Sequence, residues 1–239
     1  MRRRFFVEQF QNDRAVMEGD SAHHLGRVLR AQAGQLYELS DGSSAWLARI
    51  EAVSRDRIEF ALVERIPSYT PTLDTTLLLS IVKFDAFEWA LEKASELGVN
   101  RIIPLAAARS EKALLAASAK RAERWRKILL ESSQQCRRLR VPILEPSCKP
   151  EAAFVSQKSG VRIMLSELPE ASPLKAILGS EPATTAALAI GPEGGWTEPE
   201  FAAARGAGFR DASLGKLILR TETAVVAALA AINYALSAD

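Results

Sequence analysis

The first third of the chain alternates between apolar and polar positions with a period of two, and polar turns separate the runs. Such alternation is typical of strands that bury one face. It predicts strands over 35–39, 45–53 and 57–63. A short helix is expected over 21–29, with Ser21 as its cap. Several short strands within about sixty residues predict a small β-barrel.

Two prolines, Pro67 and Pro71, interrupt this pattern. Because proline has no backbone N–H to donate to a sheet, we expect the strands to stop here. We place a domain boundary at this point, with a β-barrel domain over 1–70 and a second domain over 71–239.

After the prolines, apolar runs alternate with segments of helical periodicity. This alternation predicts an α/β fold whose largely parallel sheet is covered by helices on both faces. Gly98 is expected to end the first of the helices. The predicted strands lie over 75–82, 101–105, 161–165 and 185–190, and the predicted helices over 87–97, 119–139, 198–207 and 225–236.

The composition is that of an ordinary globular protein, with 48% hydrophobic and 25% charged residues among 239. The longest apolar run, 224–232, is too short to cross a bilayer, and no signal peptide is recognisable. We therefore expect a cytoplasmic protein with no membrane partner. Two isolated cysteines and the adjacent His23 and His24 lack the spacing of metal ligands, so no metal site is expected.

The net charge is only +2, but the basic residues are clustered. Eight lysines and arginines lie within 120–140, with only Glu123 and Glu131 among them. Such clusters attract phosphate even when the whole chain is nearly neutral. A solvated helix face is the alternative interpretation. A second basic group consists of Arg2, Arg3, Arg4, Arg27 and Arg30.

A glycine-rich segment over 191–195 follows the predicted strand 185–190 and precedes a predicted helix. Thr197 and Glu200 have the spacing of a capping box, which makes Thr197 the expected cap of that helix. Glycines let the backbone turn sharply and approach a ligand closely. Ligands of open α/β sheets bind beyond the carboxyl ends of the strands, as here. A plain strand-to-helix turn is the alternative.

A second motif, 214–224, leads into the last predicted helix. The run Thr221-Glu222-Thr223 suits a helix N-terminus, where hydroxyls cap the backbone and an acid lies near the positive end of the helix dipole. Capping explains these three residues but not the preceding Arg220.

A third motif lies within the long basic helix, where residues 131, 134, 135 and 138 share one face by their spacing. On this face, Gln135 and Arg138 would hold a base edge or a phosphate. The alternative is a polar outer face. Competing signatures are absent: there is no Walker-type phosphate loop and no nucleophile elbow, and the glycines at 206 and 208 follow a helix rather than a strand.

In their order along the chain, the three motifs resemble the ribosomal RNA small subunit methyltransferase E family, which belongs to the SPOUT superfamily of knotted methyltransferases. The resemblance runs through nearly the whole chain, and its most specific parts are 191–195 and 219–224. It implies a SPOUT-type parallel sheet with a C-terminal trefoil knot, preceded by a PUA-like β-barrel. It also implies a homodimer that methylates N3 of a uridine in 16S ribosomal RNA within the 30S subunit.

The resemblance further implies S-adenosylmethionine as the cofactor, with its adenine among the backbone groups of three loops. The implied cofactor-binding residues are Leu165, Glu167, Gly191, Pro192, Glu193, Gly194, Gly195, Leu214, Leu219, Arg220, Thr221, Glu222 and Thr223.

Other residues are implied to act on the RNA. Arg138, of this subunit or of its partner in the dimer, is the first candidate to stabilise charge on the uracil ring, with Gln135 orienting the ring. Glu222 or Glu193 would accept the N3 proton, although each is equally explained as a structural acid. The implied RNA-binding residues are His24, Arg27, Arg30, Lys83, Arg109, Arg137 and Arg138.

The chain also departs from the family pattern. Phe84 and Arg137 stand where glycines are common, Gln134 where glutamate is common, and Ala86 and Leu217 where basic residues are usual. The changes at Ala86 and Leu217 affect the expected RNA contacts rather than the cofactor loops. Two alternatives remain: a knotted methyltransferase acting on transfer RNA or 23S ribosomal RNA, and a non-catalytic RNA-binding assembly factor.

Overall fold

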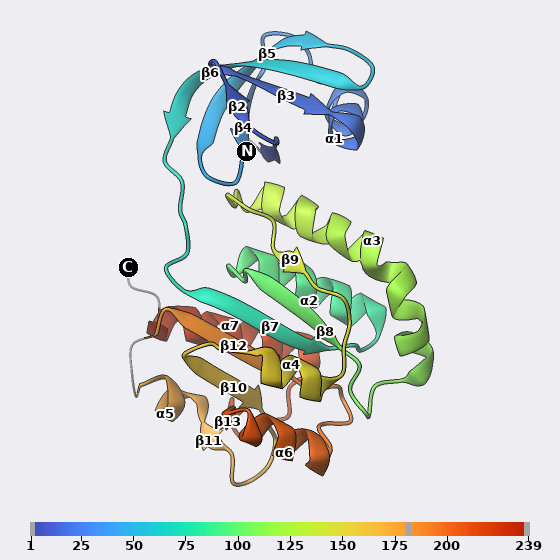
Figure 1. Cartoon of the computed structure of the whole chain (residues 1–239), viewed down its shortest axis with the longest axis vertical. Coiled ribbons are helices and arrows are strands. Elements are labelled where there is room, and N and C mark those ends of the chain that lie inside the picture. The colour runs from blue at the N-terminus through green and yellow to red at the C-terminus, as the bar shows by residue number, and fades with distance from the viewer. Residues whose placement is uncertain (1–2, 180–182, 237–239) are drawn as a thin grey trace. The chain divides into compact units, whose positions relative to one another are not determined.

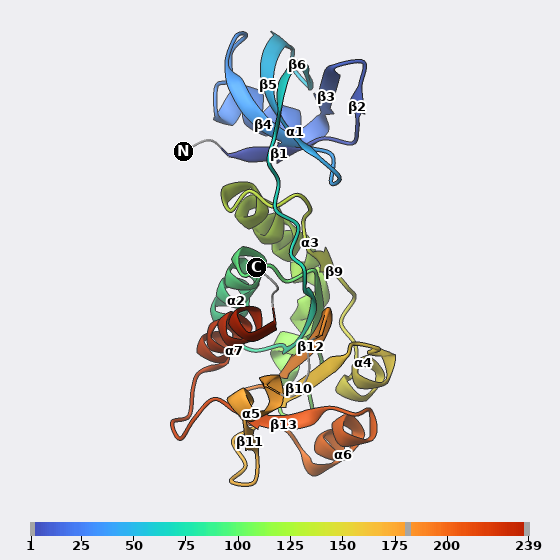
Figure 2. The same cartoon turned by 90° about the vertical axis from the view of Figure 1, so that its left-hand side faces the viewer.

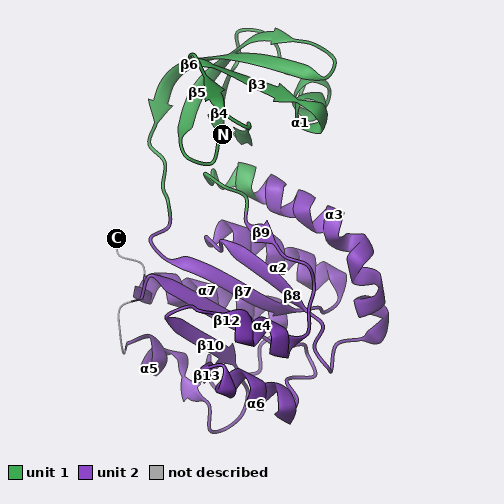
Figure 3. Ribbon diagram, viewed as in Figure 1, with its two compact units in different colours: residues 1–70, 133–141 green, residues 71–132, 142–239 purple. Residues whose placement is uncertain are grey.

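The computed structural model describes residues 3–179 and 183–236, so Arg2 of the second basic group lies outside the described residues. The chain forms two compact units (Figures 1 and 3). The first contains Met1–Thr70 together with Ser133–Val141, and the second contains Pro71–Ser132 and Pro142–Asp239. The sequence analysis placed all of 71–239 in the second domain and did not anticipate that 133–141 groups with the first unit.

The first unit is built on a curled six-stranded sheet, in which only the β1–β4 pair is parallel. Phe5, Leu39, Ile50 and Phe60 are buried in its core. The predicted strands 35–39, 45–53 and 57–63 are confirmed as β4, β5 and β6. The strands are β1 (Arg4–Phe6), β2 (Phe10–Gln11), β3 (Arg14–Glu18), β4 (Leu36–Ser40), β5 (Ala45–Val53) and β6 (Arg57–Ile66), in the spatial order β1-β4-β5-β6-β3-β2.

The predicted helix 21–29 is a composite of α1 (Gly19–His23) and a π-helical turn, η1 (His24–Val28). Ser21 does not cap it, because the helix begins two residues earlier, where Gly19 adopts a φ of +65°. The prediction of Ser21 as the cap is therefore wrong. The π-turn closes with a hydrogen bond from the amide of Leu29 to the carbonyl of His24. Such turns are rare and recur at functional sites.

The second unit is an α/β layer structure, as predicted. Its seven strands are all parallel, in the order β11-β13-β10-β12-β7-β8-β9. The strands are β7 (Asp74–Ser80), β8 (Arg101–Leu105), β9 (Ile143–Leu144), β10 (Val161–Leu165), β11 (Ser172–Pro173), β12 (Thr185–Ile190) and β13 (Arg210–Ser213).

Helices cover both faces of this sheet. Figure 2 shows α2 and α7 on one side, and α4 and α6 on the other. Phe154 of α4 and Phe201 of α6 pack with Trp196 and Phe209 against one face. No helix among the described residues is long and apolar enough to cross a membrane. The helices are α2 (Phe84–Glu96), α3 (Lys112–Gln135), α4 (Pro150–Ser156), α5 (Leu174–Leu178), α6 (Glu198–Gly206) and α7 (Thr221–Leu236).

Two helices of this unit end in the same way with different residues. After α2, Gly98 adopts a φ of +87°, and the amide of Val99 bonds to the carbonyl of Ala94. This is the Schellman arrangement predicted at Gly98. After α3, Arg137 takes the glycine position with a φ of +59°, and the amide of Arg138 bonds to the carbonyl of Ser133.

The prediction of a helix over 119–139 is therefore wrong at both ends, since α3 spans Lys112–Gln135. The end at Gln135 follows from the left-handed backbone of Arg137. Consequently, Arg138 does not share a helix face with Gln135, as its spacing had suggested. It lies on a non-helical segment that leads toward β9.

Candidate functional site

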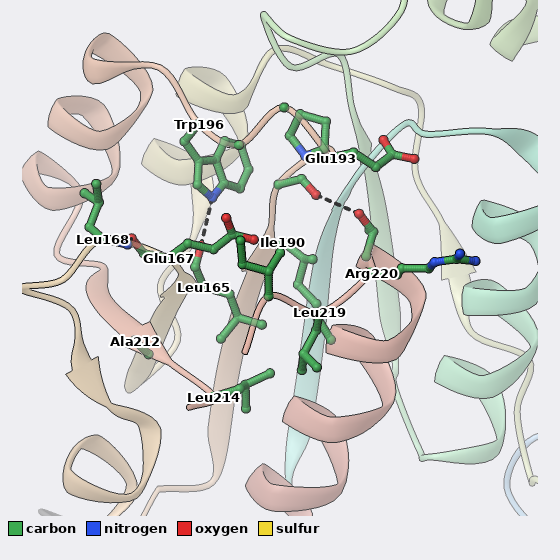
Figure 4. A pocket seen from close by; sticks show the side chains of 18 of the residues that line it. Leu165, Glu167, Leu168, Ile190, Glu193, Trp196, Ala212, Leu214, Leu219 and Arg220 are labelled. Carbon is green, nitrogen blue, oxygen red and sulfur yellow. Dashed lines mark hydrogen bonds between the residues drawn. The ribbon is translucent and has the colours of Figure 1, made fainter. Parts of the chain in front are cut away.

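Three loops meet beyond the carboxyl ends of three neighbouring strands in the second unit. They follow β10, β12 and β13, which lie side by side in the order β13-β10-β12. Together they line a pocket of about 610 Å³ (Figure 4). The carboxyl ends of parallel strands are where open α/β sheets bind their ligands, and the volume is that of an ordinary small-molecule site.

Two hydrogen bonds hold the loops together. The indole Nε1 of Trp196 donates to the carbonyl of Leu165 at 3.0 Å, which connects the glycine-rich loop to the end of β10. The hydroxyl of Thr221, the first residue of α7, donates to the carbonyl of Gly191 at 3.3 Å. Both bonds are drawn as dashed lines in Figure 4. The segments 191–195 and 214–221 are thus adjacent in space.

The glycines of 191–195 are required by close packing. A Cβ on Gly191 would lie 3.0 Å from the indole ring of Trp196, and a Cβ on Gly194 would lie 3.2 Å from the Cβ of Arg109. Gly195 has a φ of +70°, which side chains rarely adopt. The backbone therefore approaches its neighbours, and the pocket, more closely than any other residue type would permit.

A fourth segment, between β8 and α3, closes one side of the pocket. Its Arg109 lines the pocket and donates from Nη1 to the carbonyl of Gly194 at 2.9 Å. The same segment is fixed by Glu200, whose side chain is 1% exposed and accepts the amide of Ala108 at 2.8 Å. Glu200 also accepts the amide and hydroxyl of Thr197, at 2.7 and 2.8 Å, which confirms the predicted capping box.

The lining combines apolar side chains with backbone groups and a few charges. Ile190, Leu214 and Leu219 are the aliphatic part. In Figure 4 the carboxylate of Glu167 extends toward Ile190, whereas Glu193 and Arg220 extend to the opposite side from Trp196. Such a lining suits a flat heterocycle between aliphatic side chains, recognised by backbone groups, with an acid available to a positive centre.

Sequence and structure comparisons agree on the family. A model of the RNA methyltransferase domain matches residues 69–233, and a model of the RNA methyltransferase PUA domain matches residues 18–63. Curated relatives that are 33% and 31% identical to this chain bear the name ribosomal RNA small subunit methyltransferase E, and the chain belongs to that family. The predicted fold class is confirmed as an α/β domain with a parallel sheet, preceded by a PUA domain.

Curated relatives of this family come from several bacteria. The ribosomal RNA small subunit methyltransferase E of Synechocystis is 33% identical over 219 residues, covering 88% of this chain and 70% of the relative. That of Bacillus subtilis is 31% identical over 230 residues, covering 90% and 88%.

Two solved structures are similar to this chain over nearly its whole length. One from Neisseria gonorrhoeae, bound to S-adenosylmethionine, has a TM-score of 0.89 at 31% identity and covers 99% of both chains. A Legionella pneumophila methyltransferase in complex with the same cofactor has a TM-score of 0.88 at 27% identity and covers 100% of both.

Most cofactor-binding residues implied by the family resemblance line the pocket. The two that do not are Glu222 and Thr223. Successive helical residues point about 100° apart, so Thr221 and Ala224 share the lining face of α7 while the two residues between them point elsewhere. The lining residues named in advance are Leu165, Glu167, Gly191, Pro192, Glu193, Gly194, Gly195, Leu214, Leu219, Arg220 and Thr221.

Sequence reasoning missed other parts of the site. Arg109 was assigned to RNA alone, although it lines the pocket. Trp196 follows the glycines directly, but nothing in its spacing indicated that it would bond to β10. Leu168, Ile190, Phe201, Ala212 and Ala224 also line the pocket. Ser166 and residues 215–218 line it too, and they lie in the loops that the family resemblance implies for the adenine.

Two of the residues assigned to catalysis on the RNA, Gln135 and Arg138, lie outside the unit that contains the pocket. Gln135 is exposed, and Gln135 and Arg138 both belong to the first unit and are not lining residues of the pocket. The guanidinium of Arg138 donates from Nε to the carbonyl of Arg140 at 3.0 Å. Burial lowers the pKa of Arg138 below its ordinary value, which leaves a cation with reduced hydration.

The predicted RNA-binding residues are distributed over both units. Arg27 and Arg30 are exposed at the π-turn η1, where Arg30 has a φ of +53°, and His24 is half-buried at its start. Lys83 is exposed immediately before α2, and Arg137 is exposed beyond α3. Within residues 3–179 and 183–236, no three histidine, cysteine or acidic side chains are grouped as metal ligands would be.

Proposed function

We propose that this protein transfers a methyl group from S-adenosylmethionine to N3 of a uridine in 16S ribosomal RNA of the small subunit. The pocket formed by the loops after β10, β12 and β13 carries this proposal, because its position, size and glycine-rich backbone suit that donor. Family membership supports it, as do the two similar structures with the same cofactor.

The residues present fit the cofactor. The glycine loop 191–195 lines the same pocket as Leu165 and Leu219, and we place the adenine ring between these two side chains. The Glu167 carboxylate extends toward this space, where it would stabilise a positive charge (Figure 4). When bound, S-adenosylmethionine supplies a methyl group already activated by its sulfonium. The proposed cofactor-binding residues in the pocket lining are Leu165, Glu167, 191–195, Leu214 and 219–221. Glu222 and Thr223 are also proposed, although they lie outside the lining.

The chain's own residues then have to hold uracil in line with the methyl group. Positioning of this kind supplies a large part of a barrier reduction. As N3 loses its proton, negative charge spreads onto the flanking carbonyl oxygens. Arg138 is our candidate to stabilise that charge, and a partly desolvated guanidinium is more effective than a hydrated one. Gln135 orients the ring, and Glu222 or Glu193 accepts the proton.

The assembly and the RNA contacts belong to the same proposal. Residues 1–70 bind RNA through His24, Arg27 and Arg30, while Lys83, Arg109, Arg137 and Arg138 contribute from the rest of the chain. The 71–239 domain carries the transferase site and the family's trefoil knot. The enzyme acts as a homodimer on 30S subunits in the cytoplasm.

Transfer of labelled methyl from S-adenosylmethionine to purified ribosomal subunits tests this function. We expect label in 16S RNA of small subunits, recovered as 3-methyluridine after digestion and mass spectrometry, and far less label with Arg138→Ala at unchanged donor affinity. Label in transfer RNA or 23S RNA instead would favour another knotted methyltransferase. Donor binding without any transfer would leave a non-catalytic assembly factor.

A further inference from the structure

The segment that carries Arg138 is fastened to the β-sheet of the first unit by a buried ion pair. Arg4, on β1, is 4% exposed and donates from Nε and Nη2 to Oε2 of Glu38, at 3.3 and 3.1 Å. Its remaining terminal nitrogen, Nη1, donates to the carbonyl of Arg137 at 2.6 Å. Glu38 also faces Nη1 of Arg137 at 3.5 Å. One buried pair from β1 and β4 therefore holds the backbone just before Arg138.

A second contact holds the backbone just after Arg138. The buried hydroxyl of Ser40, at the end of β4, donates to the carbonyl of Leu139 at 2.8 Å. Leu139 is itself 8% exposed. The guanidinium of Arg140 donates to the carbonyl of Gly42, in the turn after β4. The carbonyls of residues 137 and 139 are both bound by side chains of the sheet, with Arg138 between them.

The segment held by these contacts lies between two regular elements, α3 and β9. The helix has ended at Gln135, and β9 begins only at Ile143, so 136–142 has no ladder of its own. Side chains of the sheet therefore bond to backbone carbonyls of this segment that would be paired within a helix or a strand ladder. Replacing a buried ion pair by apolar residues is often neutral for stability, so its presence here calls for an explanation other than stability alone.

We propose that Arg4, Glu38 and Ser40 are positioning residues for methyl transfer: they fix the backbone on both sides of Arg138. The first unit would then raise kcat, in addition to any contribution that it makes to the affinity for RNA. This inference rests on the role proposed above for Arg138. Neither Arg4 nor Ser40 needs to touch RNA or cofactor, since both are buried against 137–139.

Two variants and a matched control test the inference in the full-length protein. Arg4→Met removes the donors while keeping much of the bulk, and Ser40→Ala removes one hydroxyl. Arg57→Met is the control, because the Arg57 side chain is half exposed and pairs with Glu18 and Glu59 on the same sheet. Steady-state kinetics with small subunits and hydrogen exchange of 133–141 are the measurements.

We expect Arg4→Met and Ser40→Ala to lower kcat, the former on the order of tenfold or more, with unchanged KM for S-adenosylmethionine. Amide exchange in 133–141 should become faster in both, and Arg57→Met should match the wild type. Combining Arg4→Met with Arg138→Ala should cost less than the product of the single losses, because Arg4 acts through Arg138. If Arg4→Met fails to fold, Ser40→Ala provides the same comparison.

Three different outcomes would overturn the inference. If Arg138→Ala lowers kcat but Arg4→Met and Ser40→Ala behave like Arg57→Met, the positioning role alone is rejected. If Arg138→Ala leaves kcat unchanged, the proposed function of Arg138 fails, and the positioning role fails with it. A rise only in the KM for RNA would also reject it, since that would mean that these residues serve binding rather than turnover.

Discussion

At two positions of this protein, Gly191 and Arg137, packing or backbone conformation limits which residue type fits. At Gly191 the constraint is space, because a Cβ would lie only 3.0 Å from the indole ring of Trp196. At Arg137 it is the left-handed backbone. The glycine motif was predictable, because its position after an apolar strand is visible in the sequence. The conformation of Arg137 was not, since no local pattern marks a left-handed arginine.

Replacing Gly191 by alanine should weaken cofactor binding. The added Cβ would displace Trp196 and strain its bond to Leu165, which opens the pocket. We expect the dissociation constant for S-adenosylmethionine to rise at least about tenfold, equivalent to roughly 1.4 kcal/mol, in a calorimetric titration. Gly206→Ala is the control, because nothing lies within 4 Å of a Cβ there. Equal affinities of the two variants would contradict the packing argument.

Replacing Arg137 by glycine should relieve strain at the end of α3. Side chains in the left-handed region cost of order 1 kcal/mol or more, while the partly exposed pair with Glu38 contributes little. Arg137→Gly should therefore unfold at a higher temperature than Arg137→Ala, which loses the same pair but keeps a Cβ. The measurement is the thermal unfolding midpoint of each variant. A lower midpoint for the glycine variant would contradict the proposed backbone strain at Arg137.

At the scale of elements, the site results from strand order. β13, β10 and β12 are neighbours, so loops from distant parts of the sequence meet at one edge. Long apolar strands and the capping box of α6 were predictable, because their signals are local. The end of α3 was not predictable, because no sequence signal marks the left-handed backbone of Arg137. The two-residue strands β9 and β11 were not predictable either, because they are defined by pairing with distant strands.

Glu200 is the buried link between α6 and the segment that carries Arg109. In Glu200→Gln, an amide NH₂ would face donors that now meet carboxylate oxygens. Leaving such groups unsatisfied costs about 1–3 kcal/mol. We expect a lower unfolding temperature and weaker binding of S-adenosylmethionine. Glu198 lies on the same helix, and its side chain is 81% exposed. Glu198→Gln should therefore change neither the unfolding temperature nor the affinity for S-adenosylmethionine. Similar behaviour of the two variants would show that the buried link has no role.

At the scale of the whole molecule, the two compact units do not correspond to two continuous pieces of chain. The proline-rich break near residue 70 was visible in the sequence, and it coincides with the limit of the first unit. The inclusion of 133–141 in that unit was not visible, because it depends on contacts across about a hundred residues, such as that between Ser40 and Leu139.

Exposed arginines at the π-turn η1 should contribute to RNA affinity. If Arg27 and Arg30 each neutralise one phosphate, the double change to glutamine should weaken binding to small subunits. It should also reduce the slope of log affinity against log salt by about two. The same change at Arg55, an exposed residue in another turn of the sheet, should reduce neither by a comparable amount. An unchanged slope would place the phosphate contacts elsewhere.

The central claim is that the loops after β10, β12 and β13 form one S-adenosylmethionine site. Hydrogen exchange of the full-length protein, with and without saturating cofactor, tests it most directly. We predict slower exchange confined mainly to 165–168, 191–196 and 214–221. No change in these three segments, or protection in only one of them, would contradict the account.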